Sequence, residues 1–196
     1  FVFVNTTTNV IMLRKSYYKN NTIHLIKDYS IKFFRFINNF IVCILCKKTS
    51  TKSIIVVQNY KGGCKLVETK GKVHCITNFG STFFLGKNNG TIVIYNISRN
   101  GNIEHLNTIV YENSTNCRTV SVTKAKKSVA FCSNNGHVIL IEKKGIIYKI
   151  VKKDFLLKSV VMYKKWLFIA CKDSVHLMNR NYQTRICYSV ENIIGL

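Results

Sequence analysis

The sequence predicts an all-β chain built from repeated four-stranded sheets, and three observations support this fold class. Short apolar runs alternate with polar turns along the whole chain, which is typical of strands joined in hairpins. No segment sustains apolar residues at i, i+3, i+4 and i+7, so no amphipathic helix is expected. One strand–turn–strand pattern also recurs at a nearly constant spacing. With 196 residues, 47% of them hydrophobic, the chain is large enough for a packed core.

The clearest copies of this pattern are two apolar runs joined by Asn-Asn-Gly. Residues 82–96 can be laid over residues 128–142 in this way. Asn and Gly tolerate the positive φ that tight hairpin turns require. A third copy, residues 167–178, is one residue shorter, and looser copies lie at residues 40–57 and 1–13. Each copy therefore predicts a β-hairpin.

The first apolar residue after each turn gives the period of the repeat. These residues are Val10, Ile54, Ile92, Val138 and Val175, with steps of 44, 38, 46 and 37 residues. Repeats of β-propellers have about 40 to 45 residues and four strands per blade. We therefore predict about five four-stranded antiparallel blades of a β-propeller. Another all-β repeat or a sandwich remains the alternative, because regularly spaced hairpins also suit those folds.

We expect a single propeller domain over residues 1–196. Its blades are predicted at about residues 1–28, 29–69, 70–112, 113–152 and 153–189, with 190–196 as the first strand of the next or closing blade. The chain opens and closes on apolar residues in the middle of the pattern. We therefore expect a fragment of a longer propeller with six or more blades. Alternatively, the two ends complete one blade and close a five-bladed ring.

The repeat resembles the WD-repeat family, whose blades carry Asp-Gly-Thr, alternating apolar residues and Trp-Asp. Residues 89–96, Asn-Gly-Thr-Ile-Val-Ile-Tyr-Asn, are a degenerate version, and residues 135–142 and 173–179 match more weakly. No Gly-His pair opens a blade, and Trp166 is not at the Trp-Asp position. We therefore expect the family's His–Ser/Thr–Trp–Asp hydrogen-bond network to be missing, and the blades to hold by apolar packing alone.

The residues that carry chemistry do not predict an enzyme. The sequence has no Gly-x-Ser-x-Gly motif and no Gly-rich phosphate loop, and its eight acidic residues are scattered. Cys43 and Cys46 are the only close cysteine pair, and no second pair or histidine lies at zinc-ligand spacing. His137 and His176 are expected to face solvent or to be satisfied within strands. We therefore predict no catalytic residue, cofactor, metal site or small-molecule substrate.

The cysteines and the apolar runs bear on the compartment. Most of the eight cysteines lie inside apolar runs, where a thiol packs as a small hydrophobic group. This favours free thiols and an intracellular protein, nuclear, nucleolar or cytoplasmic, although the even count also permits four disulfides. The longest apolar run, residues 40–46, is far shorter than the roughly 20 residues of a membrane helix. No membrane contact is therefore expected.

The charge is strongly positive, with 30 Lys and Arg, eight Asp and Glu, and a net charge of +22. Such a charge attracts polyanions. Abundant Lys, Asn, Ile, Phe and Tyr with no Pro also fit an A/T-rich genome, so composition alone is a second explanation.

Propeller geometry predicts where this charge gathers. Loops from first to second strands, and from third to fourth, emerge on one face of a propeller. From residue 118 onward these loops hold eight basic residues, against three in the other loops. The predicted basic face consists of Lys124, Lys126, Lys127, Lys143, Lys144, Lys164, Lys165 and Arg180. Tyr163 and Trp166 lie beside lysines as in binders of single-stranded RNA, although packing under a lysine stem explains them as well.

Two functions follow as hypotheses. Degenerate, lysine-rich WD-repeat propellers resemble those of ribosome-assembly particles, which implies a scaffold subunit with RNA on its basic face and other protein subunits as partners. The alternative is a protein–protein adaptor of the kind found in coats, ubiquitin ligases or signalling hubs, without RNA contact. Fold analogy carries both hypotheses, and the sequence does not name the partner.

Overall fold

The structure is a computed structural model, and every helix or strand in its described residues is a β-strand. The described residues are 2–5, 10–14, 20–24, 29–59, 64–112, 114, 117–125, 128–142, 148–152, 156–164, 166–179 and 183–189. For the strands within residues 2–24, 148–152 and 184–189 only the backbone is described. The predicted last strand, residues 190–196, lies outside this set.

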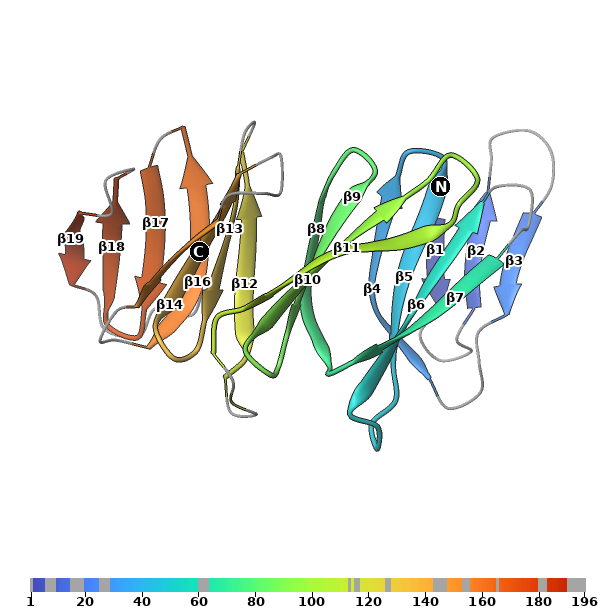
Figure 1. The fold of residues 1–196 in the computed structure, drawn as a ribbon, viewed down its shortest axis with the longest axis horizontal. Coiled ribbons are helices and arrows are strands. Elements are labelled where there is room, and N and C mark those ends of the chain that lie inside the picture. Colours follow the sequence, from blue (N-terminus) through green and yellow to red (C-terminus); the bar gives the residue numbers. More distant parts are fainter. Residues whose placement is uncertain are drawn as a thin grey trace. The chain divides into compact units, whose positions relative to one another are not determined.

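The chain divides into two compact units. One unit contains residues 1–72 and 96–104, and the other contains residues 73–95 and 105–196. In the described part of the chain, five antiparallel sheets form, each with its strands in sequence order. Figure 1 shows the strands of each sheet, coloured along the chain.

The first unit contains two sheets. The first sheet has three described strands, β1 (Val2–Asn5), β2 (Val10–Arg14) and β3 (Asn20–His24). The second sheet has four strands, β4 (Ser30–Ile37), β5 (Phe40–Cys46), β6 (Lys52–Asn59) and β7 (Cys64–Lys70). Buried side chains from its two central strands, Ile41, Cys43, Leu45 and Val56, form a hydrophobic cluster.

The third sheet runs from residue 73 to residue 110. Its strands are β8 (Val73–Phe79), β9 (Thr82–Lys87), β10 (Thr91–Ile97) and β11 (Ile103–Val110). Its two central strands are buried on both faces, whereas β11 is exposed at most positions. This gradient explains why central strands have continuous apolar runs and outer strands do not.

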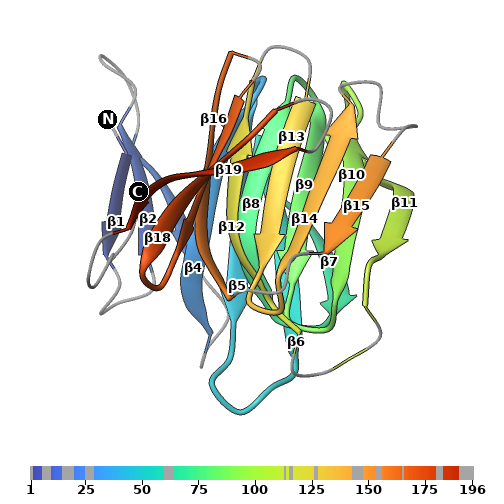
Figure 2. The same ribbon diagram turned by 90° about the vertical axis from the view of Figure 1, so that its left-hand side faces the viewer.

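The second unit continues with two more four-stranded sheets. The fourth sheet consists of β12 (Thr119–Lys124), β13 (Ser128–Ser133), β14 (His137–Glu142) and β15 (Tyr148–Lys152). The fifth consists of β16 (Leu157–Tyr163), β17 (Trp166–Cys171), β18 (Ser174–Met178) and β19 (Thr184–Ser189). The first strands of successive sheets lie close together in this unit, with β12 near both β8 and β16 (Figure 2).

The structure confirms the predicted all-β fold of four-stranded antiparallel sheets. The Asn-Asn-Gly segments form the tight turns β9–β10 and β13–β14, with positive φ of 70° at Gly90 and 86° at Gly136. All seven cysteines whose side chains are described have free thiols. Within the described residues, we find no helix with the length and apolarity needed to cross a bilayer.

Candidate functional site

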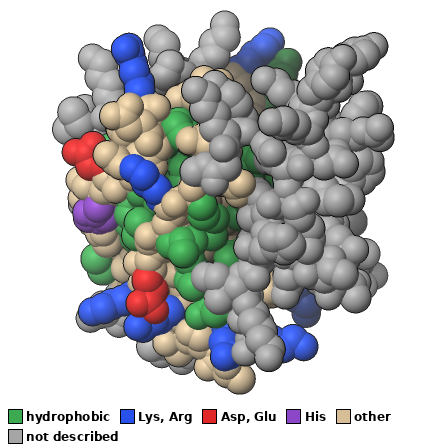
Figure 3. All heavy atoms as spheres, turned by 90° about the vertical axis from the view of Figure 1, so that its right-hand side faces the viewer, with side chains coloured by type: hydrophobic (Ala, Val, Ile, Leu, Met, Phe, Trp, Pro, Cys, Tyr) green, Lys and Arg blue, Asp and Glu red, His purple; other side chains and the backbone are tan. Residues whose placement is uncertain are grey.

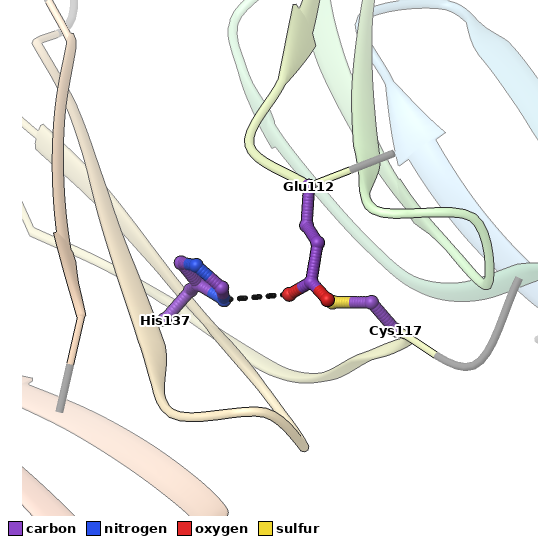
Figure 4. A group of neighbouring side chains, drawn as sticks. All are labelled: Glu112, Cys117 and His137. Atoms are coloured by element: carbon purple, nitrogen blue, oxygen red, sulfur yellow. Dashed lines mark ion pairs between the residues drawn. The ribbon is translucent and has the colours of Figure 1, made fainter. Parts of the chain in front are cut away.

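A cluster of polar side chains lies at the β13–β14 turn of the second unit. We call Glu112, Cys117, Ser133, Asn135 and His137 the Glu112 cluster. The Nδ1 atom of His137 lies 3.2 Å from one Glu112 carboxylate oxygen, and the Asn135 side-chain amide donates to the other at 3.1 Å. Figure 4 shows the carboxylate between the imidazole and the Cys117 thiol. A single carboxylate therefore joins the connection before β12 to the hairpin that follows it.

Backbone hydrogen bonds at Gly90 hold Glu112 in this place. The amides of Tyr111 and Glu112 donate to the Gly90 carbonyl at 2.9 and 3.2 Å, and the Gly90 amide donates to the Cys117 carbonyl at 2.9 Å. A Cβ at residue 90 would lie 1.6 Å from the Glu112 carbonyl oxygen. Glycine is thus required here both for its positive φ and for the close approach of the two chain segments.

Buried hydroxyl groups extend the cluster toward β9. The Tyr111 hydroxyl and the Thr119 hydroxyl are 2.9 Å apart, and Thr119 donates to the Lys87 carbonyl at 3.2 Å. The Ser133 hydroxyl accepts from the His137 backbone amide at 3.1 Å. His137 is 6% exposed and His176 is 8% exposed, and each has a serine hydroxyl within hydrogen-bond distance. Both histidines therefore have hydrogen-bond partners within strands and do not face solvent, which agrees with the second of the two alternatives expected from the sequence.

The Cys117 thiol is held in its protonated form. Burial raises its pKa above the usual range, and its hydrogen bond to Glu112 raises it further. Burial also raises the pKa of Tyr111 above its usual range. A thiol and a phenol with raised pKa values are poor nucleophiles at neutral pH. The chemistry of these two groups therefore fits a structural role better than a catalytic one.

Glu112, Cys117 and His137 also have the donor atoms of a metal site, and these atoms lie within 4.8 Å of one another. The donors nevertheless meet at the Glu112 carboxylate, not around a shared empty point (Figure 4). This arrangement fits a network in which the thiol donates to the carboxylate and the carboxylate pairs with the imidazole. The same network joins polar groups at the β13–β14 turn, so the expectation that the blades hold by apolar packing alone is wrong for the sheet β12–β15.

Two residues of the predicted basic face are described, and both lie at turns between the first and second strands of a sheet. Lys124 is exposed at the end of β12, and its ammonium donates to the Asn78 carbonyl at 3.2 Å. Lys164 is exposed between β16 and β17, with its Nζ atom 5.3 Å from the ring centroid of Tyr163. The other six residues lie outside the described part of the chain: Lys126, Lys127, Lys143, Lys144, Lys165 and Arg180.

The first unit carries basic residues that the prediction did not include. Five lysines lie around the β5–β6 turn and the end of β7, and we call them the lysine cluster: Lys47, Lys48, Lys52, Lys70 and Lys72. Figure 3 shows Lys and Arg side chains gathered at the lower end of the described surface, next to an acidic side chain. The prediction missed them because it compared loops only from residue 118 onward. Their dense spacing in the sequence was the available signal.

No protein-family model matches the sequence, and no curated protein matches it. Solved structures do resemble the fold. Saccharomyces cerevisiae Sqt1 matches at 14% identity with a TM-score of 0.71, over 95% of this chain and 57% of that one. A chain of the mitotic checkpoint complex matches at 12% identity with a TM-score of 0.67, over 97% and 64%. The Neurospora crassa Pan2 WD40 domain matches at 10% identity with a TM-score of 0.56, over 99% and 80%.

These likenesses bear on the fold alone, because the identities are 14% or less. The chain spans less than two thirds of the first two structures, at 57% and 64% of their lengths. In each case nearly the whole of this chain is aligned, and its four-stranded sheets follow one another in sequence order. The chain therefore consists of blades of a WD40-like β-propeller.

Proposed function

We propose that the chain is a non-enzymatic scaffold subunit of a ribonucleoprotein particle, of the ribosome-assembly kind, in the nucleus, nucleolus or cytoplasm. The observation that carries this proposal is the net charge of +22, which arises because 30 Lys and Arg residues face only eight Asp and Glu residues. Exposed lysines at turns, such as Lys124 and Lys164, present this charge to solvent. RNA phosphates are the abundant intracellular polyanion that such a surface attracts.

The reactive groups of the Glu112 cluster support a scaffold more than an enzyme. The Cys117 thiol is buried and protonated, and Glu112 is engaged by His137 and Asn135. An enzyme would need a nucleophile or a base with access to substrate. In this cluster the Glu112 carboxylate instead joins the connection before β12 to the β13–β14 hairpin.

A protein–protein adaptor is the second candidate, and the outer strand β11 favours it. Leu106 is 50% exposed and Val110 is 57% exposed on this strand, which ends its sheet. Outer strands with exposed apolar side chains accept an added strand from a partner. One structural neighbour is itself a chain of a protein assembly, the mitotic checkpoint complex. On this hypothesis the positive charge is compositional or complements an acidic partner.

Ultraviolet cross-linking of the tagged full-length protein in cells tests the proposal. After denaturing recovery, the amount of cross-linked RNA should be well above the amount recovered with a control propeller protein of near-zero net charge. Absence of enriched RNA, together with protein partners that survive nuclease treatment, would establish the adaptor function instead.

A further inference from the structure

We infer that the lysine cluster of the first unit is a binding surface for the phosphate backbone of RNA. The inference rests on the proposed function and names a surface outside the predicted basic face. The cluster joins the β5–β6 turn, a turn between second and third strands, to the segment that follows β7. All five lysines belong to residues 1–72, so the surface lies within one compact unit.

Strand pairing brings the two parts of the cluster together. Lys52 begins β6 and pairs directly with Lys70 at the end of β7. Lys72 reaches the other side of the turn, where its ammonium donates to the Lys48 carbonyl at 3.2 Å. Residues about twenty positions apart in the sequence therefore present their ammonium groups at the same end of one sheet.

The Lys52–Lys70 pair is unfavourable for the fold. Like charges directly opposite each other on adjacent antiparallel strands are destabilising. The Lys52 ammonium pairs with Glu68 at 2.9 Å, but this pair is exposed, with side-chain exposures of 52% and 56%. An exposed ion pair contributes about 1 kcal/mol or less. Glu68 is the only acidic residue in segment 47–72 of the sequence, which has seven lysines, so this segment carries a net positive charge that is consistent with a role in binding.

The distribution of lysine argues against composition as the only cause. Residues 29–72 contain eight lysines, whereas residues 73–112 contain one, Lys87, which is 4% exposed. A genomic bias toward lysine codons would act on both sheets alike. The described part of residues 29–72 has 15 exposed residues and residues 73–112 have 10, a difference much smaller than that of eight lysines against one. Lysine is therefore concentrated in residues 29–72, and five of these eight lysines belong to the lysine cluster.

The chemistry of the cluster favours RNA over an acidic protein. Lysine is depleted in protein–protein interfaces, and their centres are built from buried apolar side chains. None of the large apolar side chains exposed in the described residues lies in segments 47–52 or 70–72. Thr49 and Thr51 are exposed between the lysines and offer hydroxyl donors. Lysine and threonine side chains together are typical ligands of phosphate oxygens.

Binding of a labelled 20-nucleotide oligouridine to the full chain, followed by fluorescence anisotropy over a salt series, tests the inference. Lys48→Gln/Lys52→Gln/Lys70→Gln removes three charges from the cluster. The matched control Arg118→Gln/Lys158→Gln/Lys172→Gln removes three exposed charges from the other unit, at residues outside both the lysine cluster and the predicted basic face. All six side chains are exposed, so the variants should keep the wild-type melting temperature.

We expect the cluster variant to lose about two from the slope of log K against log salt, since each phosphate contact on a single strand contributes about 0.7. Its affinity at low salt should fall about tenfold or more, and the control should fall clearly less. A larger loss in the control, or equal losses, would overturn the inference and leave the proposed function standing. Wild-type protein without salt-dependent RNA binding would instead contradict the proposed function.

Competition separates RNA from acidic proteins. Unlabelled oligouridine should displace the probe at a lower concentration of charge than polyglutamate does. Displacement by polyglutamate at equal or lower charge concentration would assign the surface to an acidic protein and overturn the RNA inference.

Discussion

The sheets β4–β7 and β8–β11 share one topology but fasten their central turns differently. In β8–β11 the turn at Gly90 is joined to the next connection by backbone hydrogen bonds with Tyr111, Glu112 and Cys117. In β4–β7 the corresponding turn is joined to the segment after β7 by two side chains: the Lys72 ammonium donates to the Lys48 carbonyl at 3.2 Å, and the Ser53 hydroxyl donates to the Gly71 carbonyl at 3.3 Å. The same contact can therefore be made by backbone groups, which tolerate little change, or by side chains, which can be replaced without a backbone collision.

Replacement of Gly90 should have the largest effect. In Gly90→Ala the new Cβ would lie 1.6 Å from the Glu112 carbonyl oxygen, at a φ of 70°. We expect a loss of about 3 kcal/mol or more in the free energy of unfolding, because both backbone strain and a backbone collision are introduced. Thermal and urea unfolding measure it.

Gly80→Ala is the control for this substitution. Gly80 has a φ of 51°, but a Cβ added at this residue would meet no atom within 4 Å. Only the strain of the left-handed conformation remains, so we expect a cost of about 1 kcal/mol. Equal losses in the two variants would show that the close packing at Gly90 contributes nothing.

Replacement of Lys87 tests whether a buried lysine lowers the free energy of unfolding in the sheet β8–β11. Burial lowers its pKa to about 8, and its side chain is 4% exposed. The unfolded chain binds the proton more tightly than the folded chain, so the stability of the folded state should rise as pH increases from about 8 toward 10.5. Lys87→Met should remove this rise and add about 2 kcal/mol at pH 7.

The measurement is urea unfolding of wild type and Lys87→Met from pH 7 to pH 10.5. The difference between the two curves isolates Lys87 from the titration of the other lysines. A difference that stays constant with pH would mean that the ammonium is solvated in the folded state.

Glu112→Gln tests the polar network at the β13–β14 turn. The glutamine keeps the shape of the side chain but removes the charge that faces His137 at 3.2 Å. The His137 side chain is 8% exposed and that of Glu112 is 27% exposed, so the loss should be about 1–2 kcal/mol, less than for a fully buried pair. Chemical denaturation at pH 6 reports it, and unchanged stability would argue that the carboxylate acts only by its shape.

Lys52→Gln should have the smallest effect on stability. It removes an exposed ion pair with Glu68 and also relieves the repulsion from Lys70. We expect a change within about 0.5 kcal/mol in either direction. A loss comparable to that of Glu112→Gln would show that this lysine is structural, and would weaken its assignment to RNA binding.

Much of the fold could be predicted because it depends on local sequence. Asn-Asn-Gly at residues 88–90 and 134–136 specified the two tight turns, since Gly90 and Gly136 supply the positive φ. Continuous apolar runs such as Phe40–Cys46 marked strands buried on both faces. The period of the hairpins then indicated four-stranded sheets, which the structure confirms.

The candidate sites could be predicted only in part. Lys124 and Lys164 lie at turns between first and second strands, as the sequence predicted, and their part in a binding face stays a prediction. Glu112 was passed over as one of a few scattered acids, because no motif relates it to Asn135 or His137. The lysine cluster was missed because segments 47–52 and 70–72 become neighbours only through the register of β6 and β7.

By itself the sequence determined an all-β repeat, its turns and its positive charge, because turn chemistry and apolar periodicity act over a few residues. Only the tertiary structure decided which polar groups meet. Glu112 contacts Asn135 of the β13–β14 hairpin, 23 residues later in the sequence. Lys72 contacts Lys48, which precedes it by 24 residues, with β6 and β7 between them in the sequence. Such contacts depend on strand register and on packing between neighbouring sheets, which are set by the sum of many weak interactions rather than by any short motif.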